Sequence, residues 1–314
     1  MISPPARWPR ALVTGSGNVT GLNVVRALVA DGGIHVIGCD LEPWNPANRY
    51  CFNETVPRAD SPDYIQRVLE MVRAHSIGAV IPSNDHELRA LGEHVDELVA
   101  VGAQLNGHSV NQLAFLDKLA TSELFAANGI ATPRRLSVHS GALPMVVRKR
   151  RMGHGAKFVH ILRSSEDRSA VAHFDETAVI ATEFLEGEEF TVDILSDLEG
   201  NVLAVLPRLR RMVRHGIVHF AELVQDPLVI DTASVLATKL GLTGINCVQC
   251  IRTASTCDYF EVNPRPGSGI DLSVAAGVNL PALWVRLVHG EPVRVSEPNW
   301  GLKLIRTYDG YFFK

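Results

Sequence analysis

Three side chains that could do chemistry share one short stretch, DYFEVNPRPGSG at residues 258–269. A carboxylate, an amide and a guanidinium stand at every second position: Glu261, Asn263 and Arg265. In an extended chain, side chains two positions apart point to the same face. Burying a lone carboxylate is costly unless it is paired or binds a cation. Because the residues around Glu261 are apolar, the pattern favours a site for a charged ligand over a solvated sheet face.

A second strand, INCVQCI at residues 245–251, precedes this one across a polar turn. If the hairpin is centred near Ser255, Gln249 lies directly opposite Glu261, with Cβ atoms about 4.5–5.5 Å apart. Hard cations such as Mg²⁺ or Mn²⁺ take oxygen ligands and are often held together with phosphates. We therefore predict that Gln249, Glu261 and Asn263 bind a metal. Arg265 lies just beyond them, where it would act as a catalytic residue that braces a phosphoryl group.

Composition sets the outer limits on function. The 314 residues are 46% hydrophobic and 20% charged, which suits two or three packed units. A net charge of −4 argues against a general nucleic-acid binder. No apolar run reaches the roughly 18 residues needed to span a bilayer, and the prolines near the start do not resemble a signal peptide. Five scattered cysteines without an export signal suggest a reducing compartment, so we expect a cytoplasmic protein.

The elements that position these residues have two architectures. Up to about residue 105, short apolar strands alternate with segments of helical apolar spacing, which predicts a small parallel sheet. The turn at Asn106-Gly107 marks a boundary. A helical region follows at residues 109–130, and mixed hairpins come after it. The fold class is therefore α/β, with α+β character in the later part.

Here the motifs resemble a known family. The pattern Q-x₁₁-E-x-N-P-R, from Gln249 to Arg265, is similar to the metal-binding end of ATP-grasp enzymes in the branch of carbamoyl-phosphate synthase and biotin carboxylase. SVNQLAFLDKLATSELFAANGIATP and EFLEGEEFTVDIL resemble two other family segments in the family's order. The resemblance covers nearly the whole chain and implies an ATP-grasp fold preceded by a Rossmann-like domain. The implied domains are residues 1–105, 106–185 with a mobile basic glycine loop, and 186–314 with the metal-binding hairpin.

The resemblance also implies how ATP binds. Lys118 corresponds to a phosphate-binding lysine of the family, and Glu189 to the residue that meets the ribose hydroxyls. The backbone that meets the adenine corresponds to Glu183, Phe184 and Leu185.

One position departs from the family pattern. The family usually carries a lysine followed by proline in the strand before its mobile loop, where this chain has Arg148 and Lys149. A guanidinium also binds phosphate. Nucleotide binding is therefore expected to survive, and which of these two residues contacts the nucleotide stays open.

Four arginines fall within LPRLRRMVRHG, residues 206–216, a segment that family members often use to hold a substrate carboxylate or acyl phosphate. In an extended segment Arg208 and Arg210 share one face, and Arg211 lies on the other. A guanidinium binds a carboxylate through two parallel hydrogen bonds. We expect Arg208 and Arg211 to be catalytic residues that hold the acid, with Arg214 a weaker candidate. A solvated charge run is the alternative.

Two features of the first 105 residues need separate interpretation. GSGNVTG, residues 15–21, follows a strand and resembles a dinucleotide fingerprint, but its spacing is off by one. Such a turn also lets a helix pack closely on a sheet. Asn84, Asp85 and Glu87 follow the third strand, at the sheet edge where a cleft would lie, and could help to bind an amine.

Taken together, these features predict an ATP-dependent carboxylate–amine ligase with Mg²⁺. The small-molecule carboxylate would attack the γ-phosphate to give an acyl phosphate, and the amine would then displace phosphate. We expect neither nucleic acid nor membrane as a partner, and a homodimer is left open. The alternatives are a bicarbonate-activating carboxylase or carbamoyl-phosphate-type enzyme, an NAD(P)-dependent oxidoreductase, and an ATP-binding protein without catalysis.

Overall fold

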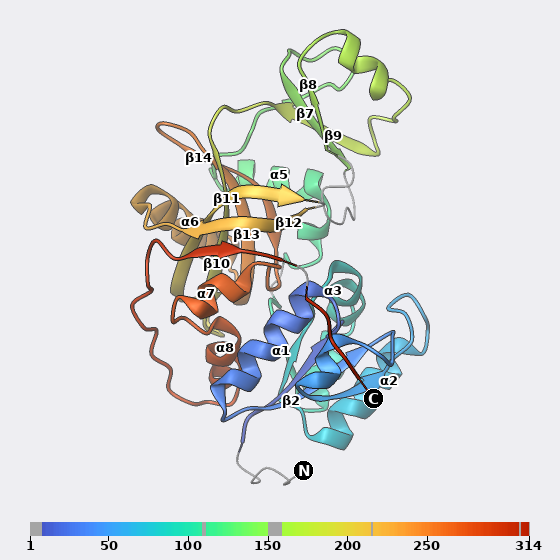
Figure 1. Ribbon diagram of the computed structural model, residues 1–314. Helices are drawn as coiled ribbons and strands as arrows, with labels where there is room; N and C mark the ends of the chain where they lie inside the picture. Colours follow the sequence, from blue (N-terminus) through green and yellow to red (C-terminus); the bar gives the residue numbers. More distant parts are fainter. Residues whose placement is uncertain (1–7, 109–110, 150–158, 215, 308, 314) are drawn as a thin grey trace.

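The computed structural model describes the chain except for residues 1–7, 109–110, 150–158, 215, 308 and 314. Three sheets follow one another in space (Figure 1). A five-stranded parallel sheet with its helices lies at one end, a six-stranded antiparallel sheet lies in the middle, and a four-stranded antiparallel sheet lies at the far end. The fold is the mixed α/β arrangement expected from the sequence.

The N-terminal sheet has neighbouring strands that all run parallel. In sheet order they are β3 (Phe52–Thr55), β2 (His35–Asp40), β1 (Arg10–Thr14), β4 (Ala79–Ile81) and β5 (Gln104–Leu105). Its helices are α1 (Val19–Asp31), η1 (Pro46–Arg49), α2 (Tyr64–His75), α3 (Asp85–Gly92) and α4 (Val95–Ala100). The strand order reverses between β1 and β4, which is where open α/β sheets bind ligands at their carboxyl edge.

The middle sheet is antiparallel throughout. In sheet order its strands are β14 (Cys257–Asn263), β13 (Gly244–Arg252), β10 (Glu188–Ser196), β11 (Val202–Arg214), β12 (Ile217–Leu223) and β15 (Lys303–Ile305). Its accompanying helices are η2 (Ala114–Leu116), α5 (Lys118–Ala127), α6 (Pro227–Leu240), α7 (Ile270–Ala275) and α8 (Leu280–Val288). Side chains alternate between its two faces, so Ile194 of β10 packs with α5 and α6, and Leu195 packs with α7 and α8.

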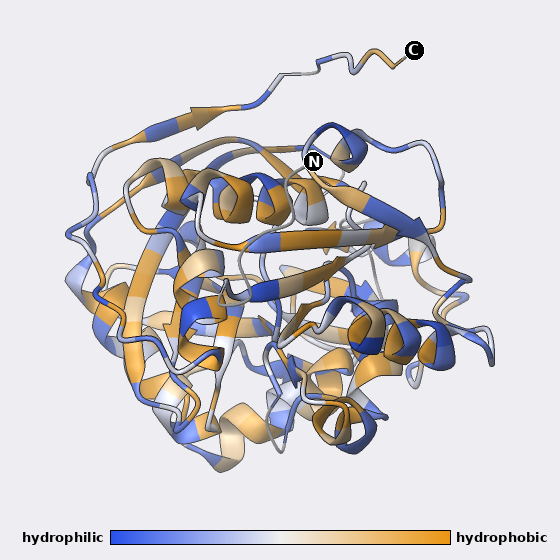
Figure 2. Ribbon diagram, turned by 90° about the horizontal axis from the view of Figure 1, so that it is seen from below, coloured by the Kyte–Doolittle hydropathy of each residue, from blue (hydrophilic) through white to orange (hydrophobic). Residues whose placement is uncertain are grey.

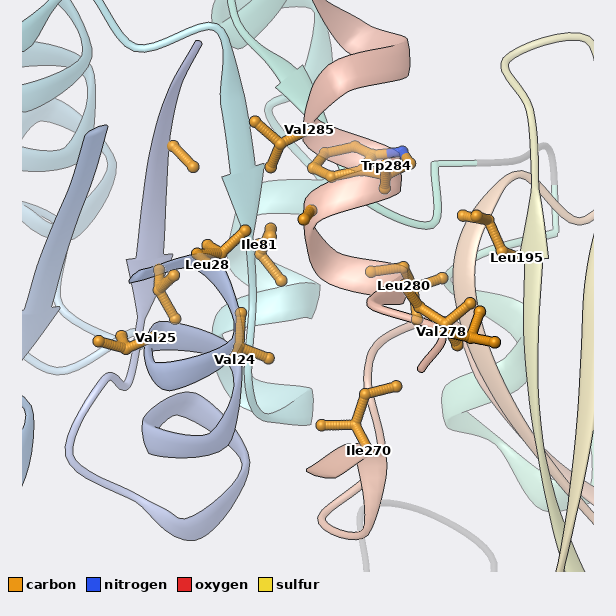
Figure 3. Packing of buried hydrophobic residues seen from close by; sticks show 14 of the residues in the cluster. Val24, Val25, Leu28, Ile81, Leu195, Ile270, Val278, Leu280, Trp284 and Val285 are labelled. Carbon is orange, nitrogen blue, oxygen red and sulfur yellow. The ribbon is translucent and has the colours of Figure 1, made fainter. Parts of the chain in front are cut away.

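One apolar core joins the N-terminal sheet to the middle sheet. Figure 3 shows Leu280 and Trp284 of α8 between Leu28 of α1 and Leu195 of β10, and all four side chains are buried. Burial of large apolar side chains is the main favourable term in folding. This shared core therefore holds the two parts of the chain in one relative position and fixes the edge at which they meet.

The four-stranded sheet has a small core of its own around Met145 and Leu162. Its strands are, in order, β6 (Arg135–Leu136), β9 (Val179–Glu183), β7 (Met145–Lys149) and β8 (Val159–Leu162), with η3 (Glu166–Ala170) beside them. The expected central subdomain, residues 106–185, contains this sheet. It also contains α5, whose Phe125 belongs to the core of the middle sheet.

Hydrophobic and hydrophilic residues are interspersed along the helices and strands (Figure 2). This distribution suits elements that bury one face and expose the other. Within the described ranges, every helix is too short or too polar to cross a membrane.

Candidate active site

The hairpin of β13 and β14 has the predicted register, with Gln249 opposite Glu261. A β-bulge follows this pair, since Cys250 is opposite Tyr259 and Phe260 is left over. Phe260 is therefore half-buried rather than part of the core. The Cζ atom of Arg148, from β7, lies over its ring at 4.7 Å from the centroid. The bulge thus links the hairpin to the four-stranded sheet.

A continuous chain of polar contacts runs across the face of the middle sheet. Lys118 Nζ lies 3.0 Å from Glu261 Oε1, and Arg210 Nη1 lies 3.1 Å from Glu189 Oε1. When the Gln249 amide is oriented so that its nitrogen and its oxygen both have hydrogen-bond partners, Gln249 joins the two ion pairs. It donates to Glu261 at 3.1 Å and accepts from Arg210 at 3.0 Å. The cations and the carboxylates of this face thus lie side by side and neutralise one another.

Lys118 owes its position to the start of α5. It is the first residue of the helix, and Asp117 caps the helix by accepting a hydrogen bond from Leu119 N at 2.8 Å. The helix therefore begins several residues later than the helical region expected over residues 109–130, and residues 109 and 110 lie outside the described residues. Phe125 anchors the same helix in the core of the middle sheet.

Arg265 is held by three neighbours. Its Nε donates to Asp85 Oδ1 at 2.6 Å, its Nη2 donates to Asn263 Oδ1 at 3.3 Å, and its Nη1 donates to the Pro266 carbonyl at 3.2 Å. Burial lowers the pKa of Arg265, but the Asp85 carboxylate outweighs burial and the net direction is upward. Arg265 is therefore a fixed cation beside the predicted metal ligand Asn263.

Arg208 lies beneath this site rather than in it. Its side chain is 1% exposed and makes two hydrogen bonds to Asp193, at 2.8 and 2.7 Å. Ser273 Oγ donates to the same carboxylate at 2.7 Å. A Cβ atom on Gly269 would lie 2.1 Å from Arg208 Nη1, so the loop after β14 packs directly on the guanidinium. Arg208 thus supports the loop that carries Arg265.

Arg211 lies outside the cluster as well. It contacts Glu188 at 3.2 Å and Glu222 at 3.6 Å, and its side chain is 45% exposed. The structure therefore brings neither Arg208 nor Arg211 to the contact chain. It brings Arg210, which the sequence reasoning did not select.

The segment expected to meet adenine lies where β9 leaves the four-stranded sheet. The Glu183 carboxylate accepts from Arg134 N at 2.8 Å, and Phe184 N donates to the Pro144 carbonyl at 3.1 Å. Leu185 follows and is half-buried. The side chain of Lys149 and the basic loop of residues 150–158 lie outside the described residues.

The glycine-rich turn of the N-terminal sheet is packed closely against its surroundings. Gly17 N donates to Asp40 Oδ2 at 2.8 Å, so an amide that could bind a phosphate in this turn is already paired with a carboxylate. A Cβ atom on Gly21 would lie 2.2 Å from the Gly15 carbonyl oxygen. These glycines therefore let α1 pack closely on the sheet. This agrees with the interpretation of the turn as a packing feature rather than as a dinucleotide-binding motif.

The donors at the hairpin suit magnesium that arrives with a nucleotide. Glu261 supplies one carboxylate, and Gln249 and Asn263 supply amide oxygens. Mg²⁺ usually takes one or two carboxylates and completes its shell with water and phosphate oxygens. In the part of the chain that the structure describes, no cluster of three His, Cys, Asp or Glu could hold a metal by itself.

Comparison with known proteins adds two family matches. Residues 175–307 match the family described as ATP-grasp in the biosynthetic pathway with Ter operon, and residues 12–105 match the PylC-like N-terminal domain. The D-alanine–D-alanine ligase of Cupriavidus taiwanensis is 30% identical over 129 residues, 36% of this chain and 38% of the ligase. That of Xylella fastidiosa is 25% identical over 196 residues, 54% of this chain and 64% of the ligase. The matches thus cover less than two thirds of either ligase.

A solved structure shares the fold over almost the whole chain. It is the ADP complex of an N5-carboxyaminoimidazole ribonucleotide synthetase, with a TM-score of 0.76 and 19% identity. The alignment covers 96% of this chain and 81% of that one. Its likeness confirms the predicted fold class. Residues 175–307 therefore resemble an ATP-grasp family, residues 12–105 resemble the PylC-like N-terminal domain, and the chain as a whole has the fold of this synthetase.

Proposed function

We propose that this protein is an ATP-dependent ligase that joins a small-molecule carboxylate to an amine and releases ADP and phosphate. The observation that carries the proposal is the contact chain from Lys118 through Glu261, Gln249 and Arg210 to Glu189. Cations suited to phosphates and oxygens suited to magnesium meet there. Phosphoryl transfer requires little more of a protein than positioning and charge neutralisation.

ATP would bind across the joint between the four-stranded and the middle sheets. The backbone of residues 183–185 would meet the adenine, Glu189 the ribose, and Lys118 and Arg148 the phosphates. Nucleotide binding would open the Lys118–Glu261 ion pair, because a phosphate then replaces Glu261 as the partner of Lys118. Glu261, Gln249 and Asn263 would hold Mg²⁺, which supplies neutralisation of charge on the terminal phosphates.

The chemistry would take place in two balanced steps. A carboxylate oxygen attacks the γ-phosphorus, the bond to the β-phosphate oxygen breaks, and ADP leaves. The amine nitrogen then attacks the acyl carbon, the carbon–oxygen bond to phosphate breaks, and the amine gives up a proton. Arg265 would brace the phosphoryl group during its transfer. In this proposal Arg210 faces the reacting groups, and Arg208 supports them from below.

The named relatives favour amide formation over bicarbonate activation. The curated matches are D-alanine–D-alanine ligases, whose name describes the joining of two amino acids. The likeness to the ribonucleotide synthetase is at 19% identity and bears on the fold alone. The oxidoreductase alternative is disfavoured by the Asp40 carboxylate at Gly17.

A screen of amino acids and other small carboxylates, each paired with amines, would test the proposal by ADP release. We expect release that needs ATP, Mg²⁺, one acid and one amine together. Stabilisation by NAD(P) without any response to ATP would contradict the proposal. The cytoplasmic location remains a prediction, which cell fractionation would test, and light scattering would decide whether the protein is a homodimer.

A further inference from the structure

Asp85 links the N-terminal domain to the active-site cluster. Its Oδ1 lies 2.6 Å from Arg265 Nε, and the two side chains are 13% and 15% exposed. Asp85 is the first residue of α3, and Asn84 caps that helix by accepting from His86 N at 3.1 Å and Glu87 N at 3.0 Å. The carboxylate therefore projects from a fixed helix start.

The contacts of Arg265 leave part of its guanidinium for a ligand. Within the described residues, its hydrogen bonds use one N–H on each of its three nitrogens. An arginine side chain has five N–H donors in a rigid plane, so one N–H remains on each terminal nitrogen. The bond from Nε to Asp85 sets the direction in which that plane faces.

The backbone of the loop is held independently of Asp85. Gly269 packs on the buried Arg208, and the Ser268 carbonyl accepts from Asn23 Nδ2 at 3.0 Å and from Arg306 Nη2 at 3.1 Å. Loss of the Asp85 carboxylate would thus free the guanidinium of Arg265 while leaving the loop in place.

We propose that Asp85 is a positioning residue that aims Arg265 at the phosphoryl group in transfer. The N-terminal domain then controls the transfer step, in addition to any part it takes in substrate binding. This inference rests on the proposed phosphoryl transfer, but not on which acid or amine is joined. It assigns Asp85 to Arg265 rather than to the amine substrate.

The test measures binding of a phosphoryl-transfer mimic, aluminium fluoride with MgADP, by calorimetry. We expect Asp85→Ala and Arg265→Ala to bind MgADP like the wild type. Each should lose about 10- to 100-fold in affinity for the fluoride complex, the usual scale for supporting residues of a site. The double variant should be no worse than Arg265→Ala alone, because Asp85 acts through Arg265. Asp85→Glu should recover part of the loss.

Asp60→Asn is the matched control, because it removes an exposed carboxylate that pairs with Arg58. We expect it to behave like the wild type. Three results would overturn the inference. Asp85→Ala could bind the fluoride complex as tightly as the wild type, or the losses of affinity in the two single variants could add in the double variant. Equally, aluminium fluoride could fail to increase the affinity of the wild type for MgADP. Asp85→Asn, which keeps the shape of the side chain, replaces Asp85→Ala if the latter melts early. The losses of fluoride affinity could be non-additive as expected while no pair of acid and amine releases ADP. That result would refute the proposed ligase and leave this inference standing.

Discussion

Replacing Glu87 with glutamine should change how the stability of the protein depends on pH. Glu87 is 7% exposed, and Thr14 Oγ1 donates to its carboxylate at 2.8 Å. Burial raises the pKa of Glu87 from 4.5 to about 8, and the nearby Asp40 adds to this increase. Near neutral pH the carboxyl is therefore mostly protonated, which disfavours Glu87 as the anion that pairs with an ammonium substrate.

The sign and size of the effect follow from linkage. The folded state binds the Glu87 proton more tightly than the unfolded state, so this contribution to stability is complete below pH 4.5. It is lost as the pH rises through about 8. Between pH 5.5 and pH 9 the loss is about 3 kcal/mol. Glu87→Gln cannot lose a proton and should keep this stability.

Urea unfolding at pH 5.5, 7 and 9 measures the difference between variant and wild type. From pH 5.5 to pH 9, the unfolding free energy of Glu87→Gln should rise by about 3 kcal/mol relative to that of the wild type. Glu93→Gln is the control, because Glu93 is exposed and pairs with Arg89. Its unfolding free energy should differ from that of the wild type by the same amount at all three pH values. A constant difference between Glu87→Gln and the wild type at all three pH values would refute the reasoning.

Three further predictions concern the candidate site. Glu261→Gln should melt like the wild type but lose at least about 10²-fold in ADP release, the scale of one lost electrostatic contact; normal turnover with normal Mg²⁺ dependence would remove Glu261 from the metal site. Lys118→Ala should raise the Kd for ATP by about 10- to 100-fold with little change in the KM for the acid, because hydrogen bonds to charged groups contribute roughly 1.5–3 kcal/mol; equilibrium binding and initial rates separate the two. Arg208→Ala should cost roughly 3–5 kcal/mol of unfolding free energy, because it leaves the buried Asp193 without its partner; wild-type stability in urea would contradict a supporting role.

Local patterns were enough to predict the hairpin and the parallel sheet. The pairing of Gln249 with Glu261 follows from counting residues from a polar turn, since side chains alternate strictly along a strand. The bulge that turns Phe260 toward Arg148 was missed, because no sequence pattern marks it. The last helical segment before residue 105 is divided into two helices, α3 and α4, since α3 ends at Gly92 and α4 begins at Val95.

Contacts between distant segments could not be predicted from the sequence. Asp85 and Arg265 are 180 positions apart, and contacts between the N-terminal and middle sheets, such as the packing of α1 against α7 and α8, bring them together. Alternation along a strand places Arg208 and Arg210 on one face and does not tell which of the two reaches a ligand. The register of β10 with β11 places Leu209 opposite Phe190, and hence Arg210 beside Glu189. Arg210 and Arg211 thus have acidic partners near the start of β10, whereas Arg208 is opposite Thr191 and reaches the buried Asp193.

The nucleotide products of the complete reaction test the central claim most directly. The contact chain runs from Lys118 and Glu261 through Gln249 and Arg210 to Glu189, and residues 183–185, which are expected to meet adenine, lie just before the strand that carries Glu189. If Mg²⁺ binds at Glu261 as proposed, the site would stabilise charge that develops between the β- and γ-phosphates. Chromatography of the nucleotides, with the true acid and amine present, should show ADP and inorganic phosphate in amounts equal to the amide. AMP and pyrophosphate as the main products would contradict the acyl-phosphate mechanism.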